Sequence, residues 1–450
     1  MKLILLSGGS GKRLWPLSND IRSKQFLKIL RNEEGEYESM VQRVYRQINE
    51  TQIINGNLQS SDITIATGSS QVESIKSQLG EGVNIVIEPE RRDTFPAILL
   101  AAAYLKFEKN TPMDETIIIL PVDPYADLEY FRLLNLMDQK VQEGAFEIVL
   151  MGTKPTYPSA KYGYIVPERD TDGEFVVNHF EEKPSEEKSA VLIQDGALWN
   201  AGVFAFQMGY ITKILESYIS VSSYSQMQQM YSKLKKTSFD YAVVEKCKSI
   251  AVVKYEGTWK DLGTWNTLTE ELGEKNIGQT VLGEDCSNTN VINELEIPVV
   301  ALGMKNVVVA ASPDGILVSD KEKSSFLKPY VESIQKRPMY EEKYWGDYKV
   351  LDYATDGESK KVLTKRVRIS SGKAIAYQSH NVRDEIWTIV SGEGDLLLDG
   401  HIRNVRCGDV VYIVKGQKHS IRAVSDLYLI QVEIGEELSE EDIILHKWDW

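Results

Sequence analysis

The first residues that could do chemistry form a glycine-rich loop near the N-terminus, Ser7-Gly8-Gly9-Ser10-Gly11-Lys12-Arg13. Glycines let the backbone approach a phosphate closely, and the N–H groups at the start of a following helix would point at the bound anion. The loop is not a Walker A motif, because the first glycine of that motif would fall at Leu6 and Arg13 replaces Ser or Thr. A glycine-rich turn can also simply join a strand to a helix, so the loop alone predicts only a phosphate-compatible turn.

The residues after this loop carry a family resemblance. The chain continues as Leu14-Trp15-Pro16-Leu17-Ser18 and, a little later, as Lys24-Gln25-Phe26-Leu27. With the glycines, these strings resemble the signature of sugar-1-phosphate nucleotidyltransferases, and in detail that of mannose-1-phosphate guanylyltransferases. Lys12 departs from the Thr or Ser that is usual in the family, which changes the hydrogen bonding of the loop but adds a phosphate-compatible charge.

The resemblance implies roles for the residues of this loop. In such enzymes a sugar phosphate oxygen attacks the α-phosphorus of a nucleoside triphosphate, and charge on the phosphate oxygens is stabilised by Arg, Lys and Mg²⁺. The resemblance implies that Arg13 holds the departing phosphates and Lys24 the α-phosphate. It also implies that the nucleotide lies against the first strand and the loop, at Leu6, Gly8, Gly9, Gly11 and Lys12.

A second string, Glu88-Pro89-Glu90-Arg91-Arg92-Asp93-Thr94-Phe95-Pro96-Ala97, resembles the base-contacting loop of the family. The resemblance implies nucleotide contacts from Glu88, Arg92 and Thr94. Arg91 replaces the usual Gly and Asp93 the usual Asn, so the resemblance supports nucleotidyl transfer more firmly than a preference for guanine.

Two aspartates stand where the family holds Mg²⁺. Asp123 lies in Pro121-Val122-Asp123-Pro124 after an apolar run, and Asp261 lies in Trp259-Lys260-Asp261-Leu262-Gly263. A Mg²⁺ ion that bridges phosphates and one or two carboxylates is the usual arrangement. Taken alone, either Asp would more often be a turn or cap residue. Their matching contexts favour the metal interpretation.

The acceptor sugar has its own motifs. Phe180-Glu181-Glu182-Lys183-Pro184 and Trp199-Asn200-Ala201-Gly202-Val203-Phe204 resemble two family strings, and Gly163 lies in a third, Tyr162-Gly163-Tyr164-Ile165. The resemblance implies that Glu182 binds sugar hydroxyls, Lys183 the sugar phosphate, Asn200 a hydroxyl or the phosphate, and the Gly163 backbone the hexose. Most Glu–Lys pairs are solvated surface charges, but several motifs in the order of the family favour a site.

The C-terminal part resembles a cupin barrel and the isomerase half of bifunctional enzymes that interconvert fructose 6-phosphate and mannose 6-phosphate. The four metal-ligand positions of the cupin pattern are Gln378, His380, Glu385 and His419. This set suits Zn²⁺ or another divalent ion. Two further histidines of the isomerase pattern are replaced by Val382 and Ile386, so isomerase activity stays open. The alternative is a barrel kept for dimerisation or stability.

Strands and helices alternate in the first 273 residues and position the motifs there. Apolar runs predict strands at 2–6, 63–66, 83–87, 116–120 and 147–151, and helical patterns cover 94–107 and 130–143. A strand, the glycine loop and a helix should open this α/β, Rossmann-like sheet, which we expect to be mostly parallel. Its ligands should lie beyond the carboxyl ends of the strands.

After residue 273 the pattern changes to short β-branched runs at 280–282, 290–292, 299–302, 307–310 and 316–319. These predict a short left-handed β-helix, followed by a charged linker with a short helix and then the cupin β-barrel. The expected domains are 1–273 for nucleotidyl transfer, 274–335 for the β-helix and linker, and 336–450 for the barrel.

Composition narrows the classes of function. The chain has 450 residues and a net charge of −15, which disfavours a general nucleic-acid binder. No apolar run approaches the roughly 20 residues that span a bilayer, so no membrane partner is expected. Three widely spaced cysteines suit free thiols in a reducing compartment, and we expect a cytoplasmic protein.

The hypothesis is that GTP and α-D-mannose 1-phosphate give GDP-mannose and pyrophosphate with Mg²⁺, in a homo-oligomer, a dimer. Three alternatives remain open: the same chemistry with another nucleotide or hexose phosphate, a bifunctional enzyme with isomerase activity, and a sugar-nucleotide sensor without catalysis. Five retained residues argue against the sensor: Arg13, Lys24, Asp123, Lys183 and Asp261.

Overall fold

The computed structural model describes residues 1–9, 11–168, 176–334, 337–356 and 360–450, so Ser10 of the glycine loop lies outside the described residues. The chain divides into two compact units. The first unit holds Met1–Leu14, Ser23–Ile75 and Gly82–Gly273. The second holds Trp15–Arg22, Lys76–Glu81 and Glu274–Trp450.

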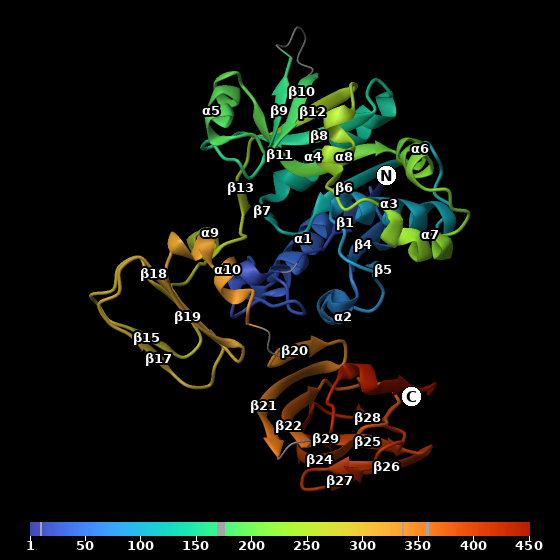
Figure 1. Cartoon of the computed structure of the whole chain (residues 1–450), viewed down its shortest axis with the longest axis vertical. Helices are drawn as coiled ribbons and strands as arrows, with labels where there is room; N and C mark the ends of the chain where they lie inside the picture. The colour runs from blue at the N-terminus through green and yellow to red at the C-terminus, as the bar shows by residue number, and fades with distance from the viewer. Residues whose placement is uncertain (10, 169–175, 335–336, 357–359) are drawn as a thin grey trace. The chain divides into compact units, whose positions relative to one another are not determined.

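The first unit is built on a mixed sheet whose main strand order is β10-β9-β11-β6-β1-β4-β5, with β8 paired to β11 and β12 to β8 (Figure 1). Its strands are β1 (Lys2–Leu6), β4 (Ile63–Gly68), β5 (Asn84–Glu88), β6 (Thr116–Pro121), β8 (Ile148–Thr153), β9 (Gly163–Pro167), β10 (Val177–Glu182), β11 (Leu198–Gln207) and β12 (Ile250–Tyr255). β1 runs parallel to β4 and β6, and β4 to β5, as predicted. β11 runs antiparallel to β6, β8 and β9, so the sheet is parallel only in part.

This topology positions the predicted nucleotide motifs. The glycine loop follows β1, Glu88 is the last residue of β5, and Asp123 follows β6. Since these strands are parallel, their carboxyl ends meet at one edge of the sheet, where α/β folds bind ligands.

Nine helices precede residue 273 in the described part of the chain. They are α1 (Met40–Ile48), α2 (Val72–Leu79), α3 (Thr94–Phe107), α4 (Leu128–Glu143), α5 (Glu186–Gln194), α6 (Met208–Tyr218), α7 (Tyr224–Met230), α8 (Phe239–Ala242) and α9 (Trp265–Glu271). Four of them, α3, α4, α5 and α6, pack on this sheet. α3 is apolar on nearly every side because it lies buried between the β1–β4–β5 part of the sheet and α6, α7 and α8. α4 starts two residues before the predicted position, since Asp127 caps it by accepting a hydrogen bond from the Glu129 N–H. No helix in the described part of the chain is both long and apolar enough to cross a bilayer.

The prediction of a helix directly after the glycine loop is wrong. The described residues there form two short 3-10 turns and no α-helix, at Lys12–Leu14 and Lys24–Phe26. Gly11 adopts a φ of +57°, outside the right-handed helical region, and Pro16 has no N–H to continue a helix. The described residues of the glycine loop therefore offer loop backbone and side chains, and no helix N-terminus, to a ligand.

The second unit begins with short strands in parallel ladders. They are β14 (Asn276–Ile277), β15 (Thr280–Leu282), β16 (Asn290–Asn293), β17 (Val299–Ala301), β18 (Val307–Ser312) and β19 (Gly315–Asp320). β14, β16 and β18 pair in parallel and β15 pairs with β17, while β19 closes the group in antiparallel fashion. Val291, Ala301 and Val309 fill the small core between the two ladders. The parallel ladders agree with the expected β-helix, whose left-handed sense stays a prediction. α10 (Lys328–Val331) is the short helix of the linker.

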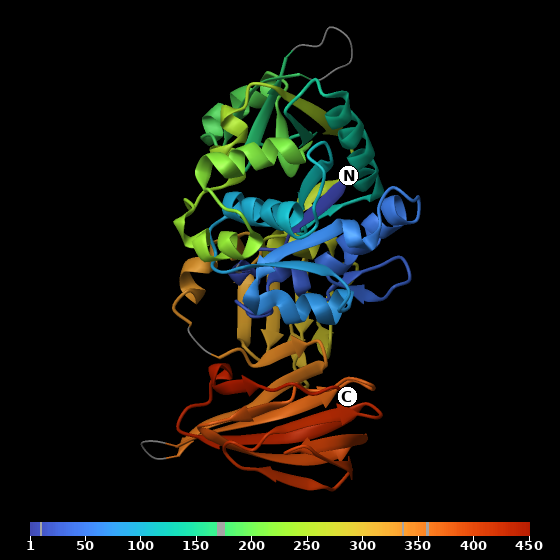
Figure 2. The same cartoon turned by 90° about the vertical axis from the view of Figure 1, so that its right-hand side faces the viewer.

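The C-terminal part of the second unit, from β20 to β30, forms the cupin barrel, drawn in orange to red in Figure 2. One sheet has the order β20-β21-β22-β29-β24-β27 and the other β26-β25-β28-β23-β30. The strands are β20 (Tyr340–Lys343), β21 (Gly346–Asp356), β22 (Lys360–Ile369), β23 (Gln378–His380), β24 (Arg383–Ser391), β25 (Glu393–Leu398), β26 (His401–Arg406), β27 (Val410–Ile413), β28 (His419–Ala423), β29 (Leu427–Gly435) and β30 (Ile443–Leu445). Buried side chains such as Trp387, Leu396 and Leu429 join the two sheets in one core. The predicted cupin fold is confirmed.

Candidate active site

A cavity of about 330 Å³ lies at the carboxyl edge of the first sheet. Seven of the predicted residues line it: Leu6, Gly8, Gly9, Glu88, Arg92, Thr94 and Asp123. They come from β1, the glycine loop, β5, the start of α3 and the end of β6. The volume falls in the range of small-molecule sites, and the backbone of two glycines is exposed at its wall.

The side chains of the second motif differ in what they can offer a ligand. Glu88 is buried, accepts a hydrogen bond of 2.8 Å from the Tyr231 hydroxyl, and has a pKa that burial raises. Arg92 donates to the Leu234 carbonyl at 2.7 Å. The Thr94 hydroxyl accepts from the Phe239 N–H at 2.9 Å. Arg92 and Thr94 therefore hold the chain between α7 and α8 in place, in addition to lining the cavity.

The structure brings the two predicted metal ligands together. β7 (Pro124–Ala126) and β13 (Trp259–Asp261) form an antiparallel ribbon in which Asp261 lies opposite Pro124, the neighbour of Asp123. Lys24 Nζ lies 2.9 Å from Asp123 Oδ2 and 3.1 Å from Asp261 Oδ1.

The position between the two carboxylates accepts positive charge. Burial alone would lower the pKa of Lys24, but the charges of Asp123 and Asp261 outweigh it and raise the pKa. Because an ammonium group already sits between the carboxylates, their oxygens fit a hard cation such as Mg²⁺.

The acceptor motifs also meet in space. β9 and β10 pair so that Gly163 lies opposite Glu182, and a Cβ at residue 163 would lie 2.5 Å from Glu182 Oε2. Lys183 Nζ lies 2.5 Å from Glu182 Oε1. Asn200 donates to Asp240 Oδ1 at 2.8 Å and accepts from the Gly202 N–H.

Burial governs the electrostatics of this cluster. Burial raises the pKa of Glu182 against the opposing effect of Lys183. Burial and then the charge of Glu182 raise the pKa of Asp240 to about 7. Glu182 and Asp240 together thus hold less negative charge near neutral pH than two exposed carboxylates would.

An aromatic cluster connects the acceptor motifs to the metal-ligand ribbon. The rings of Tyr162 and Trp199 lie 4.6 Å apart, and Trp259 lies 5.5 Å from Tyr162. Tyr162 precedes Gly163, Trp199 precedes Asn200 and Trp259 starts β13, so packing in this cluster aligns three motifs.

The remaining residues of the glycine loop differ in position. Gly11 packs against residues 23 and 24. A Cβ added to Gly11 would lie 2.7 Å from the backbone nitrogen of Lys24. Lys12 is half-buried and Arg13 is exposed, and neither is among the described residues that line the cavity. The structure therefore leaves Arg13 at the periphery of the cavity.

Two residues of this region have no place in the sequence-based prediction. Gln71 lines the cavity and donates to the Gly9 carbonyl at 3.0 Å. The sequence signal for Gln71 is its position just after β4, because β4 is parallel to β1 and its carboxyl end lies at the same edge of the sheet. Asp240 lies half-buried on the four-residue α8, and no signal in the sequence indicates that it contacts Asn200.

The four predicted cupin ligands converge inside the barrel. Ligand atoms of His380, Glu385 and His419 all lie within 4.8 Å of one another, and these three side chains are buried. Gln378 Nε2 lies 3.5 Å from His380 Nε2. Val382 is exposed and Ile386 is half-buried between the inward-facing Glu385 and Trp387, so neither replaced histidine position belongs to this buried group.

The donor set fits a metal ion through His419. Its Nδ1 lies 2.9 Å from the Gln417 carbonyl oxygen, so Nδ1 carries the hydrogen. Burial lowers the pKa of His419 despite the charge of Glu385, which favours the neutral ring with a lone pair on Nε2. Nε2 is buried, has no hydrogen-bond partner among the described residues, and lies 3.8 Å from Glu385 Oε2. Two acceptors that face each other at this distance favour a cation between them.

Other charges in the barrel were missed from the sequence. Arg383 Nε donates to Glu385 Oε1 at 3.1 Å, and Lys365 Nζ lies 2.6 Å from Glu433 Oε1. All four of these side chains are buried. Burial would raise the pKa of Glu385, but the hydrogen bond from His380 and the nearby positive charges lower it.

Known protein families match the sequence in both the N-terminal and the C-terminal part of the chain. Residues 2–275 match the nucleotidyl transferase family, and residues 332–447 match the mannose-6-phosphate isomerase C-terminal family. A mannose-1-phosphate guanylyltransferase of Salmonella montevideo is 30% identical, over 98% of this chain and 97% of its own length. The alginate biosynthesis protein AlgA of Pseudomonas putida is 28% identical, over 98% and 94%.

Among solved structures, the mannose-1-phosphate geranyltransferase of Thermus thermophilus is 27% identical with a TM-score of 0.61, and the match covers 74% of this chain and 99% of that one. The full-length relatives align with this chain across both of the regions that the two family models match. The chain belongs to the family of mannose-1-phosphate guanylyltransferases, which join a nucleotidyl transferase domain to a mannose-6-phosphate isomerase C-terminal domain.

Proposed function

We propose that this protein transfers the guanylyl group of GTP to α-D-mannose 1-phosphate and releases pyrophosphate. The observation that carries the proposal is the convergence of Asp123, Asp261 and Lys24, because Asp123 also lines the cavity of the glycine loop. The nucleotide would lie against Leu6, Gly8 and Gly9, with Glu88 at the base end of the cavity.

In the proposed reaction a phosphate oxygen of mannose 1-phosphate attacks the α-phosphorus of GTP. The new P–O bond forms as the bond to the bridging oxygen of the β-phosphate breaks, and pyrophosphate carries that electron pair away. Asp123 and Asp261 would hold Mg²⁺, which when bound supplies positive charge for the phosphate oxygens. Lys24 would add charge at the α-phosphate. The exposed Arg13 and the half-buried Lys12, both in the 3-10 turn after the glycine loop, would hold the leaving phosphates.

The acceptor sugar would occupy the cluster around Gly163. Without a Cβ at this position, a hydroxyl can reach the Glu182 carboxylate, while Lys183 is half-exposed and available to the sugar phosphate. Asp240 orients Asn200, whose carbonyl oxygen is already bonded to the Gly202 N–H. Asn200 would thus offer the sugar an oriented amide.

The test is Asp261→Asn with Asp195→Asn as the matched control. Asp195 is exposed at the end of α5, so the control makes the same change of charge away from the site. We expect the Asp261 variant to lose on the order of 10²–10³-fold in kcat, because the carboxylate acts on charge that develops in the transition state. Unchanged kcat in a folded Asp261 variant would contradict the assignment.

The choice of base and sugar needs its own measurement. Arg91 and Asp93 both line the cavity where the family usually carries Gly and Asn. Pyrophosphate release should be measured for four nucleoside triphosphates against several hexose 1-phosphates. We expect GTP with mannose 1-phosphate to have the highest kcat/KM. A higher kcat/KM with another pair would change the assigned substrates but not the assigned reaction. If no pair released pyrophosphate, the result would favour a sensor without catalysis.

A second activity is favoured by His419 Nε2, which finds no hydrogen-bond partner in the described part of the barrel. We infer that His380, Glu385 and His419, with Gln378 beside them, hold Zn²⁺ or another divalent ion and that this site serves isomerisation of mannose 6-phosphate. Metal content of the purified chain should fall on His419→Ala and stay unchanged on His401→Ala, which alters an exposed histidine of β26. A coupled assay that starts from fructose 6-phosphate then tests the isomerase. A metal-free wild type without isomerase activity would support a structural barrel.

We further propose that residues 1–273, 274–335 and 336–450 act as three domains and that the protein is a homodimer. Its three free cysteines suit a reducing cytoplasm. GDP-mannose would serve polysaccharide biosynthesis, in line with the name of the Pseudomonas relative. Light scattering of the purified chain would test the dimer.

A further inference from the structure

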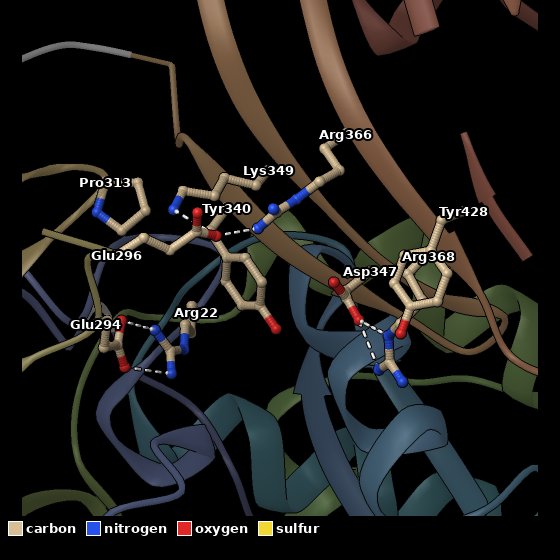
Figure 3. Close-up of a pocket in the computed structure, with 10 residues that line it drawn as sticks. All are labelled: Arg22, Glu294, Glu296, Pro313, Tyr340, Asp347, Lys349, Arg366, Arg368 and Tyr428. Atoms are coloured by element: carbon tan, nitrogen blue, oxygen red, sulfur yellow. Dashed lines mark hydrogen bonds and ion pairs between the residues drawn. The ribbon is translucent and has the colours of Figure 1, made fainter. Parts of the chain in front are cut away.

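We propose that the outer face of the cupin barrel carries a second ligand site, which binds a phosphorylated sugar and lies outside both the transferase cavity and the barrel interior. The site is a cavity of about 500 Å³ in the second unit (Figure 3). This volume suits a small metabolite.

The strand register of the barrel builds one wall of the cavity. β20, β21 and β22 pair so that Tyr340 lies beside Lys349 and Lys349 beside Arg366. Two residues along, Asp347 lies beside Arg368, and Arg368 beside Tyr428 of β29. Side chains two residues apart on a strand share a face, so both rows project from one side of the sheet. The intervening residues, such as Tyr348 and Val367, belong to the barrel core, so this side is the outer one.

The charge of the cavity is unusual for this chain. Four basic and three acidic side chains line it among the described residues, although the whole chain has a net charge of −15. Arg22 and Glu294 form a two-pronged ion pair with distances of 2.8 and 2.9 Å. The three cations on the barrel strands have two acidic partners. Arg366 and Lys349 both contact Glu296, and Arg368 pairs with Asp347. Glu342 lies beside Asp347 on the neighbouring strand, and its charge acts on Arg22 and Tyr340. The four cations are therefore balanced by four acids, and a ligand anion would bind by replacing one of these acids.

Glu296 is the contact that an anion can replace. Its side chain is 65% exposed, and Arg366 and Arg368 are 45% and 41% exposed. An exposed ion pair contributes little net stability, so a phosphate that accepts several hydrogen bonds from arginine can take the place of the carboxylate.

The other lining groups suit the sugar part of a ligand. Figure 3 shows the ring of Tyr340 between the Arg22–Glu294 pair and the Asp347–Arg368 pair, with its hydroxyl directed into the space between them. Both bonds from Arg368 go to Asp347 Oδ2, so Oδ1 can accept a hydrogen bond from a sugar hydroxyl. Phenol rings with carboxylates and amphipathic side chains bind the mixed polar and apolar surface of a pyranose.

The experiment measures binding to the full chain by titration calorimetry. The probes are glucose 6-phosphate, mannose 1-phosphate and GDP-mannose, with inorganic phosphate and glucose as simpler ligands. The test variant is R366Q/R368Q. Its matched control, R403Q/R406Q, removes the same charges from exposed positions on β26 in the other sheet. E296Q is a third variant, which removes the competing carboxylate.

We expect at least one sugar phosphate to lose about tenfold or more in affinity on R366Q/R368Q, to keep its affinity on the control, and to bind E296Q more tightly than wild type. Binding in the transferase cavity or the barrel interior would not change, so it would appear as a separate component. Equal binding of every probe to wild type and R366Q/R368Q would overturn the proposal. Inorganic phosphate binding as tightly as the sugar phosphates would overturn the assignment of a sugar ligand.

Discussion

Single charged residues in this protein have properties that depend on what surrounds them. Lys24 holds two carboxylates that would otherwise repel each other, and Asp240 lies among acidic neighbours with one amide donor from Asn200. In the barrel, the neutral His419 ring faces a carboxylate across 3.8 Å. Clusters of charged groups with shifted pKa values such as these are expected where anionic substrates or metal ions bind.

Asp240 should make the stability of the first unit depend on pH. Burial raises its pKa in the folded state to about 7, above the unfolded value near 3.9. The folded state therefore binds more protons between these values, and the free energy of unfolding should fall as pH rises from about 4 to about 7. In urea unfolding, Asp240→Asn should lose stability less steeply than wild type over this range.

The matched control for this prediction is Asp195→Asn at an exposed position. It should follow the wild-type pH dependence. A wild type and an Asp240 variant with parallel stability curves would contradict the assigned pKa.

Short elements position the proposed catalytic groups more than the long helices do. The β7–β13 ribbon sets Asp261 beside Asp123, and the 3-10 turn at residues 24–26 presents Lys24 to both. That turn packs directly on Gly11, so the glycine loop and Lys24 form one structural piece. A change in the loop should therefore affect the charge cluster even where no charged residue is altered.

Gly11→Ala tests this coupling between the loop and Lys24. The new Cβ would lie 2.7 Å from the backbone nitrogen of Lys24, at a position whose positive φ already disfavours alanine. We expect a loss of about 1–3 kcal/mol in stability and a fall of about 10²-fold in kcat/KM, since a small displacement of a positioning group is costly.

Gly35→Ala is the control for the conformational part of that effect. Gly35 also has a positive φ, +83°, but an added Cβ would meet no atom of the described residues within 4 Å. It should cost only about 1–2 kcal/mol and leave kcat/KM unchanged. Equal effects of the two substitutions would show that contact with Lys24 is unimportant.

At the scale of the molecule, each compact unit has a hydrophobic core of its own. Residues of the first core include Ile4, Leu99 and Phe206, and those of the barrel core include Val367, Trp387 and Leu429. Proteins with separate cores commonly unfold in more than one step. Ligands of one unit should then stabilise that unit selectively.

Scanning calorimetry should show two transitions for the full chain. GTP with Mg²⁺ at about 100 times its Kd should stabilise the transferase unit by about 2.7 kcal/mol and raise one transition by several degrees. The other transition should stay in place. Equal shifts of both transitions would contradict independent unfolding, and no shift at all would contradict nucleotide binding.

The sequence by itself determined the local elements and the family. The apolar runs at residues 2–6 and 116–120 are short, which favours buried strands, and the uninterrupted pattern at 94–107 is long enough for a buried helix. The motifs around Asp123, Glu182 and His380 indicated the chemistry because residue type and spacing limit what can bind a phosphate or a metal.

Only the tertiary structure decided which groups share a site. Asp123 and Asp261 are far apart along the chain, and the ribbon of β7 and β13 that brings them together is visible only in the structure. The structure also shows that the chain after the glycine loop forms a short 3-10 turn where a helix was predicted. Polar partners such as Asp240, and the basic face around Arg366 and Arg368, arise from strand pairing and packing between segments far apart in sequence. Local propensity acts over a few residues, whereas pKa shifts and cavities depend on the whole set of neighbours that the fold assembles.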